Sequence, residues 1–314
     1  MKQFFQSFSR LTTGTVLCLL LLQSASAQTD MDAIMLPKNY FCSGAMYSHS
    51  SWKDYWEGTF KRNNLNLGTV STQMFGVMGN YGISNKLNVL FGLPYVKTKA
   101  SAGTLKGMKG VQDLSLTIKW MPLEKEIGNG TISLYALGGI SFPVTNYVAD
   151  FLPLSIGMHS KNATIRGMAD YQLQHFFVTV SGMYTRRSNI KIDRTAYYTT
   201  DVHYTNEVKM PDMAGFNLRT GFRSSQWIAE AVVNNFTTLG GFDIRKNDMP
   251  FPSNKMNGAS AGINFKYSFT SISGLELTAG GNYMIKGRNI GQSTSINAGV
   301  FYFIDLTKKK KTQS

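Results

Sequence analysis

The chain has little cysteine and, beyond its N-terminus, no long apolar run. Its 2 cysteines are Cys18 and Cys42, and a predicted cleavage site lies between them. The mature protein would therefore keep Cys42 alone and could form no internal disulfide. After Ala27 no stretch approaches the roughly 20 consecutive apolar residues that a membrane-spanning helix needs. These absences exclude a disulfide-stabilised domain and a helical membrane protein.

Histidine is also scarce, which limits the chemistry available for catalysis or metal binding. No cluster of histidine, cysteine and acidic residues has the composition of a zinc site, and Gly103–Gly107 lacks the Gly-Lys-Ser/Thr ending of a phosphate loop. His159 and Ser160 are adjacent, so in a strand they would point to opposite faces. We predict no enzyme, no metal and no cofactor, and a membrane-embedded lipid hydrolase is the least favoured function. The 4 histidines are His49, His159, His175 and His203.

The N-terminus has the order of a secretory signal peptide. Lys2 and Arg10 precede the apolar run Thr15–Leu22, and Ala25-Ser26-Ala27 forms a cleavage site. The run is too short for an anchor helix, and a lipoprotein signal at Cys18 is disfavoured because a leucine precedes it. We predict a signal over residues 1–27 and a mature chain that begins near Gln28.

Positive charge exceeds negative charge in the mature chain as well. The formal net charge of +14 falls to +12 when Lys2 and Arg10 leave with the signal, and Lys308–Lys311 carries four of these charges. In an exported protein this balance favours an anionic membrane surface or anionic solutes over nucleic acid. Residues 307–314 are interpreted as a basic, soluble end.

The clearest local pattern is an alternation of period two on paired arms. The stretch Phe75–Tyr95 forms two such arms around the polar turn Ile83–Lys86, and Val111–Met121 alternates most cleanly. Alternation shows one face of a strand to an apolar surround and the other to a more polar one. The arms have about the length of a tilted membrane-crossing strand, roughly 9–11 residues.

The same pattern recurs down the chain and predicts about twelve strands. Short links near Ile83, Glu124, Gln174, Ser224 and Thr270 alternate with long ones that begin at Lys99, Pro143, Asn189 and Leu239. Outer-membrane barrels have short periplasmic turns and long outside loops. We predict an all-β, transmembrane, antiparallel up-and-down barrel over residues 55–306. Residues 28–54 are expected to be a periplasmic lead-in, and Trp56–Lys61 the first strand.

Residues on the parity opposite to the apolar positions are predicted to line the lumen. Several are small: Ser115, Thr117, Ser133, Thr179, Gly262, Asn264, Thr278 and Gly280. Charges of both signs indicate either a wet pore or an interior cross-linked by ion pairs, and the slight basic surplus would favour anionic solutes. The charged candidates are Glu57, Lys61, Asp113, Lys119, Arg166, Asp170, Arg219, Arg223, Glu230, Lys266, Glu276 and Lys286.

Three short motifs resemble one family of outer-membrane barrels. Tyr81–Leu87 reads YGISNKL, Leu93–Tyr95 reads LPY, and Gly110–Leu114 reads GVQDL. They are similar to the YG turn, the L-P-Y and the G-x-x-D-L of the "MetA-pathway of phenol degradation" family, over the first half of the predicted barrel. The resemblance implies a transporter-like barrel that passes small, often aromatic, molecules. The tail Thr307–Ser314 departs from the many outer-membrane barrels that end on an aromatic residue.

Two functions from different classes remain, and an open lumen distinguishes them. Twelve strands enclose a lumen wider than the filled interior of about eight strands and narrower than a porin of sixteen or more. We expect an outer-membrane channel that passes small solutes by diffusion, with outer-membrane lipid around it and a monomeric state favoured. The alternative is a structural or partner-binding barrel whose lumen is blocked and whose long loops are the working surface.

Overall fold

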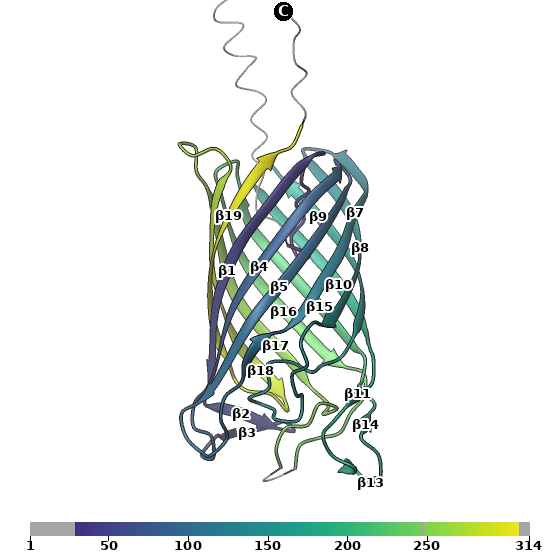
Figure 1. Cartoon of the computed structure of the whole chain (residues 1–314). Helices are drawn as coiled ribbons and strands as arrows, with labels where there is room; N and C mark the ends of the chain where they lie inside the picture. The colour runs from purple at the N-terminus through teal and green to yellow at the C-terminus, as the bar shows by residue number, and fades with distance from the viewer. Residues whose placement is uncertain (1–28, 246–247, 308–314) are drawn as a thin grey trace, which may run out of the picture.

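Twelve antiparallel strands close into a single barrel (Figure 1), which confirms the predicted fold class. The computed structural model describes residues 29–245 and 248–307. Within those residues no helix is long and apolar enough to cross a membrane. The barrel strands are β1 (Tyr40–Trp52), β4 (Val70–Ser84), β5 (Leu87–Ala100), β7 (Asp113–Ile127), β8 (Gly130–Pro143), β9 (Asn162–Leu173), β10 (Phe176–Arg187), β15 (Met213–Arg223), β16 (Trp227–Thr238), β17 (Asn257–Ser268), β18 (Leu275–Arg288) and β19 (Thr294–Asp305).

The remaining strands are short and belong to the connections. The strand β6 (Lys109–Val111) pairs with β5 directly beyond β7, so β6 and β7 act as one strand interrupted at Gln112. The others form three small hairpins outside the barrel wall: β2 (Asp54–Glu57) with β3 (Phe60–Asn63), β11 (Ile190–Lys191) with β14 (Glu207–Val208), and β12 (Tyr197–Tyr198) with β13 (Val202–His203).

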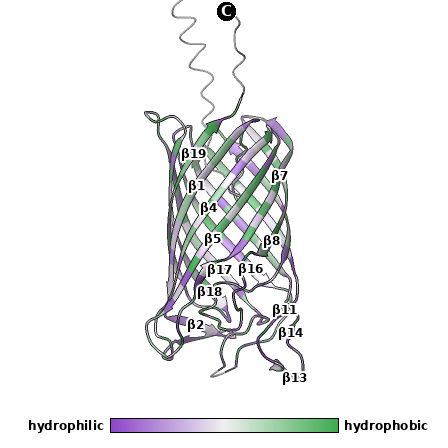
Figure 2. Ribbon diagram, in the orientation of Figure 1, coloured by the Kyte–Doolittle hydropathy of each residue, from purple (hydrophilic) through white to green (hydrophobic). Residues whose placement is uncertain are grey.

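The alternation of side chains produces an apolar outer face. On β7, Leu116, Ile118 and Trp120 are exposed, whereas Thr117 is half-buried and Lys119 fully buried between them. Large apolar side chains recur on the outer face of the other strands, as at Ile165 and Ile263, and Figure 2 shows strands on which hydrophobic and hydrophilic positions alternate. A closed ladder leaves no free edge, so the wall needs no partner for its backbone groups.

The predicted order of short and long connections is confirmed. The turns that join β4 to β5, β7 to β8, β9 to β10, β15 to β16 and β17 to β18 are short. The connections that alternate with them at the other end are longer, except for the five residues between β18 and β19. Tyr40 pairs with Asp305, so the start of β1 and the end of β19 both lie at the short-turn end of the barrel, at the top of Figure 1. At Gly128, in the turn between β7 and β8, the backbone has a φ of 61°, which favours glycine.

The first barrel strand lies earlier than the sequence predicts. It is β1, inside the expected lead-in, and it pairs along its length with both β4 and β19. The predicted first strand, Trp56–Lys61, is wrong as part of the barrel, because Trp56 and Glu57 lie on β2 and pair with β3 in a hairpin at the long-loop end. Small and polar residues on both faces, such as Ser43, Gly44 and Ser48, hide the alternation of β1.

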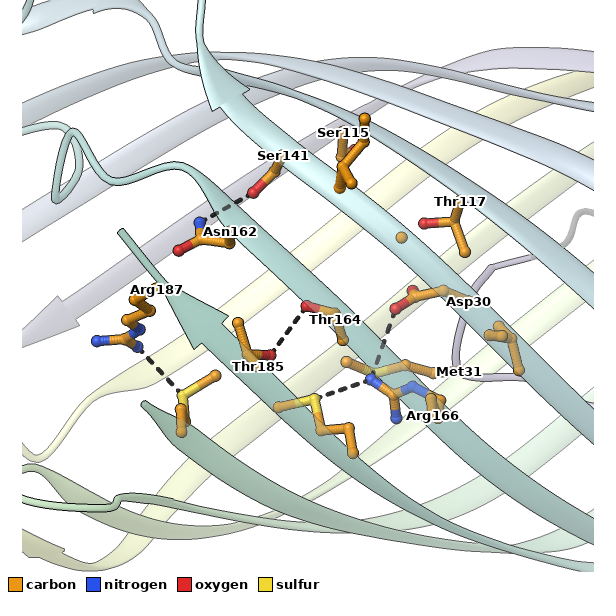
Figure 3. Close-up of a pocket in the computed structure, with 15 residues that line it drawn as sticks. Asp30, Met31, Ser115, Thr117, Ser141, Asn162, Thr164, Arg166, Thr185 and Arg187 are labelled. Atoms are coloured by element: carbon orange, nitrogen blue, oxygen red, sulfur yellow. Dashed lines mark hydrogen bonds and ion pairs between the residues drawn. The ribbon is translucent and has the colours of Figure 1, made fainter. Parts of the chain in front are cut away.

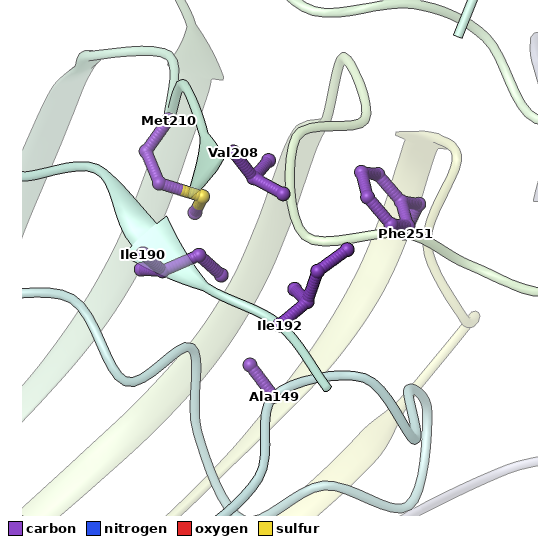
Figure 4. Close-up of a cluster of buried hydrophobic side chains, with 6 residues drawn as sticks. All are labelled: Ala149, Ile190, Ile192, Val208, Met210 and Phe251. Carbon is purple, nitrogen blue, oxygen red and sulfur yellow. The ribbon is translucent and has the colours of Figure 1, made fainter. Parts of the chain in front are cut away.

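The long connections between β8 and β9, β10 and β15, and β16 and β17 pack together through a small apolar core. Figure 4 shows its six buried side chains, which come from all three loops: Ala149, Ile190, Ile192, Val208, Met210 and Phe251. We call this group the loop core. The partly buried side chains packed against it, Met158, Tyr197 and Phe242, also belong to these loops. The loop core is therefore a second centre of packing at the long-loop end.

A polar clamp ties the third of these loops to the end of β18. Arg288 donates from Nε and Nη2 to the two carboxylate oxygens of Asp243, at 2.8 and 2.5 Å. Hydrogen bonds from Arg288 and Asn289 hold the pKa of Asp243 below its usual range. Asn289 also accepts from the backbone N–H groups of Gly58 and Ile244, so one amide joins three connections.

Candidate functional site

The lumen is crossed by the chain that precedes β1. Residues 29–37, which we call the N-terminal segment, lie inside the barrel near its short-turn end, where their dark ribbon shows between the strands of Figure 1. Asp32 in this segment is buried, with Oδ1 3.1 Å from Lys119 Nζ and Oδ2 3.0 Å from Lys266 Nζ. Lys119 lies on β7 and Lys266 on β17, which are separated by five strands in either direction around the barrel. One carboxylate therefore bridges opposite walls.

The ammonium group of Lys119 is also the centre about which the N-terminal segment turns. Its Nζ donates to the carbonyl oxygens of Thr29, Asp32 and Ile34 at 3.1, 2.6 and 2.9 Å. Tyr135 on β8 adds a hydrogen bond from its hydroxyl to the carbonyl of Ala33 at 2.9 Å. A buried charge is tolerated only when its hydrogen-bonding capacity is met, and the segment supplies these acceptors to Lys119.

The turn that presents Asp32 is built locally. The N–H and hydroxyl of Thr29 donate to Asp32 Oδ2 at 2.7 and 3.1 Å, and the N–H of Asp32 donates back to Thr29 Oγ1 at 3.2 Å. Such reciprocal side-chain bonds stabilise a turn. These local hydrogen bonds hold the carboxylate of Asp32 in the orientation in which it contacts the two lysines.

The C-terminal half of the segment packs against β1 and β4. Leu36 is fully buried in a cluster with Cys42, Phe301 and Phe303. Gly82 makes this approach possible, because a Cβ at that position would lie 2.8 Å from the carbonyl oxygen of Leu36 and closer still to that of Pro37. The segment therefore covers Cys42, the thiol that the described chain contains.

Four of the other charged lumen candidates form two ion pairs along the wall. On neighbouring strands, Arg219 Nη1 lies 2.7 Å from Glu230 Oε1, and Asn264 donates to the same oxygen at 2.9 Å. Arg223 Nη1 lies 3.1 Å from Asp170 Oδ2, and its guanidinium stacks 4.0 Å over the Phe177 ring. Arg219 and Arg223 therefore present compensated charge rather than a free positive lining.

Asp113 and Glu276 lie near the two ends of the lumen, whereas Glu57 and Lys61 lie on the β2–β3 hairpin, so their predicted place in the lumen is wrong. Asp113 accepts a hydrogen bond of 2.5 Å from the Tyr147 hydroxyl at the long-loop end. Glu276 is buried near the short-turn end, where Ser268 donates to its carboxylate at 3.1 Å. Arg166 faces a cavity described below. Lys61 lies on β3, outside the barrel wall, where it pairs with Asp54 at 3.2 Å.

Lys286 lies on the outer face, so its predicted place in the lumen is wrong. In the ladder between β17 and β18, Ser260 pairs with Met284 but Ala259 pairs with Lys286. The extra residue, Ile285, forms a β-bulge, and both Ile285 and Lys286 are exposed. A bulge shifts the parity of every residue beyond it, which a count of alternate positions does not detect.

Cavities lie on both sides of the N-terminal segment. On the long-loop side lies a cavity of about 320 Å³, which we call the outer cavity. It is lined by β7 to β10, by Met213 of β15 and by Asp30 and Met31 of the segment (Figure 3). On the short-turn side a cavity of about 390 Å³ lies between residues 33–37 and Met121, Tyr135 and Arg223. The segment therefore divides the lumen into two compartments.

The sequence reasoning missed several charged residues of the lumen, among them Glu124, which lines the short-turn cavity. Asp30 and Asp32 lie in the expected lead-in, and Arg187 lies at the end of β10 on the edge of the outer cavity. Arg187 has the parity of Thr179, so alternation alone would have included it. The signal for the aspartates was the basic surplus of the inward set, which calls for acidic partners from elsewhere in the chain.

Comparisons with known proteins connect this barrel to solved outer-membrane structures. The structure is similar to an outer membrane channel from Pseudomonas putida F1, with a TM-score of 0.70 and 15% sequence identity over 88% of this chain and 99% of that one. It also matches the translocator domain of the autotransporter NalP from Neisseria meningitidis, with a TM-score of 0.45 and 10% identity over 94% and 97% of the two chains.

The fold is that of an outer-membrane barrel. No family model matches the chain, and no curated protein matches it. The resemblance to the MetA-pathway family therefore stays a prediction.

Proposed function

We propose that the protein is a bacterial outer-membrane channel for small molecules whose lumen is closed by its own N-terminal segment. The observation that carries the proposal is the Asp32 bridge between opposite walls, with a cavity on either side of it. A closure made by a segment that is not part of the barrel strands is reversible in a way that a lumen filled by strand side chains is not. The exposed apolar outer face supports the membrane location.

The proposal extends to orientation and solute. By analogy with outer-membrane barrels, the short turns face the periplasm and the long loops face outward, and the segment closes the lumen from the periplasmic side. Solutes cross passively, and the MetA-pathway resemblance favours small aromatic or hydrophobic compounds. A monomer surrounded by outer-membrane lipid is sufficient, since all compartments of the lumen lie within one chain.

Planar-bilayer recordings on Asp32→Asn and on a deletion of residues 29–36 test the closure. Removing one partner of a buried ion pair costs about 3–5 kcal/mol because the remaining charge stays buried. Both lysines lose their shared counter-charge in Asp32→Asn, so the docked segment is destabilised. We expect the mean conductance to rise in Asp32→Asn and to rise further in the deletion variant.

The matched control is Asp201→Asn, which removes an exposed loop carboxylate and should conduct as the wild type does. Folding is checked by the shift in gel mobility that an intact barrel shows between unheated and heated samples. If both variants fold and neither passes ions or a panel of sugars and aromatic acids, the channel function is wrong. The blocked barrel, with its long loops as a partner-binding surface, then replaces it.

A further inference from the structure

The outer cavity is lined by polar groups of the barrel wall and by apolar side chains from both the wall and the N-terminal segment. Its apolar part comes from Leu137 and the thioethers of Met31, Met183 and Met213. Figure 3 shows the polar side chains on successive strands around the same space: Ser115, Thr117, Ser141, Asn162, Thr164 and Thr185. An apolar pocket with a few placed polar groups is the usual form of a small-molecule site.

Two arginines face this cavity, and both are poorly matched by the acceptors around them. Arg166 is buried and donates to Ser181 Oγ at 3.1 Å and to Met183 Sδ at 3.2 Å. Its ion pair is with Asp30 at 3.5 Å, and the Asp30 side chain is 48% exposed. Arg187 Nη2 donates to Met213 Sδ at 3.3 Å, and no carboxylate of the described chain lies within ion-pair distance of it.

The contrast with the rest of the lumen shows that this arrangement is specific to the cavity. Arg219 and Arg223 each have a carboxylate at 2.7 and 3.1 Å. Arg166 has the half-exposed Asp30 carboxylate at 3.5 Å beside the Met183 thioether, and the Arg187 guanidinium donates to the Met213 thioether. A thioether is a weak acceptor, and a guanidinium has five donors that match a carboxylate in a fork. The cavity therefore holds positive charge that its own walls compensate incompletely.

We propose that the outer cavity binds a small organic monocarboxylate. Its carboxylate takes the place of Asp30 on Arg166, and its apolar part lies against Met31, Met183 and Leu137. Arg187, about four residues further along the paired strands and thus roughly 13 Å nearer the loops, attracts the anion toward the cavity. The inference rests on the proposed function only for the source of the ligand, a solute that arrives from the long-loop side.

Titration calorimetry of the detergent-solubilised full-length protein tests the site with hexanoate and with its uncharged analogue hexanamide. We expect hexanoate to bind at least about tenfold more tightly, because a charge-assisted hydrogen bond is lost in the amide. Arg166→Gln should weaken hexanoate binding by a similar factor and leave the weak binding of hexanamide unchanged. Arg187→Gln should weaken hexanoate binding less.

The matched control is Arg186→Gln, since Arg186 adjoins Arg187 in sequence but is exposed on the opposite face of β10. It should bind hexanoate as the wild type does. Equal affinities for hexanoate and hexanamide, or wild-type affinity in folded Arg166→Gln, would overturn the proposal. If Arg166→Gln does not fold, hexanoate binding is measured on Arg166→Lys and Arg187→Gln instead. Because binding is measured without conduction, a failure here is distinct from a failure of the Asp32 variants to conduct.

Discussion

Lys119 shows how a single residue can organise the interior of this barrel. Its side chain has 0% exposure, and its ammonium has four oxygens of the N-terminal segment within hydrogen-bond distance. Burial of an uncompensated ammonium would cost several kcal/mol. The charge on β7 therefore determines where the segment lies, because no other part of the described chain contributes a hydrogen bond to that group.

The same strand provides the sharpest test of inward and outward parity at the residue scale. Leu116 is exposed on the outer face, and Thr117 lines the outer cavity. Leu116→Arg should cost roughly 2–4 kcal/mol, as a charge facing hydrocarbon near the midplane does, whereas Thr117→Arg should cost much less because its side chain reaches a polar lumen. Unfolding titrations in bilayers measure both changes. Equal destabilisation would contradict the assigned faces.

At the scale of elements, the N-terminal segment depends on the small residue at Gly82 of β4. Gly82→Val should push residues 36 and 37 away from the wall, because a Cβ there meets two of their carbonyl oxygens. Such overpacking costs about 1–3 kcal/mol, which raises the undocked fraction roughly 5- to 150-fold. Cys42 is buried under Leu36, so its labelling by a maleimide reagent reports the change.

Gly167→Val is the control for that experiment, since a Cβ at Gly167 meets no atom within 4 Å. It should label as slowly as the wild type. Rapid labelling of the wild type itself would contradict a docked segment, and slow labelling of folded Gly82→Val would contradict the role of Gly82. This readout is independent of conduction and of ligand binding.

Elements with a clear physical signal could be predicted from the sequence, and those without one could not. The strand β7 alternates cleanly, and the faces of Leu116 to Trp120 follow from period two alone, although the strand continues to Ile127, six residues beyond the predicted end, past a register shift between Trp120 and Leu123. The strand β1 has small and polar residues on both faces, so its pairing is decided by its neighbours β4 and β19. Lys286 depends on a bulge set by the ladder with β17. The wrong predictions for β1 and Lys286 both depend on pairing with strands that are distant in the sequence or on the ladder that those strands form.

The candidate site also contains residues that the sequence predicted and residues that it did not. Alternation placed Lys119 and Lys266 among the inward charges, and the structure has both on the inner face. Nothing in the sequence joined them to Asp32, because Asp32 lies 87 residues before Lys119 and 234 residues before Lys266. A buried lysine predicts that an acceptor lies nearby, but the sequence did not show which residue supplies it.

At the scale of the whole molecule, the barrel and the loop core are two separate packing units, and their stabilities should separate. The barrel is held by its closed ladder, whereas the loop core depends on six buried side chains. Val208 is fully buried there, so Val208→Asp places an unpaired charge in the loop core and should disrupt it. Val202→Asp is the control, because Val202 is 54% exposed in the same loop.

Limited trypsin digestion combined with heat-dependent gel mobility measures the two units at once. Trypsin should cleave Val208→Asp rapidly at Lys191, Arg194 and Lys209, which lie in the connection between β10 and β15. The barrel should keep its folded mobility, because no backbone pair of its ladder involves Val208. Loss of the folded barrel together with the loop core would show that the two form one cooperative unit. Wild-type resistance to trypsin in Val208→Asp would show that polar contacts, such as the clamp between Asp243 and Arg288, hold the loops instead.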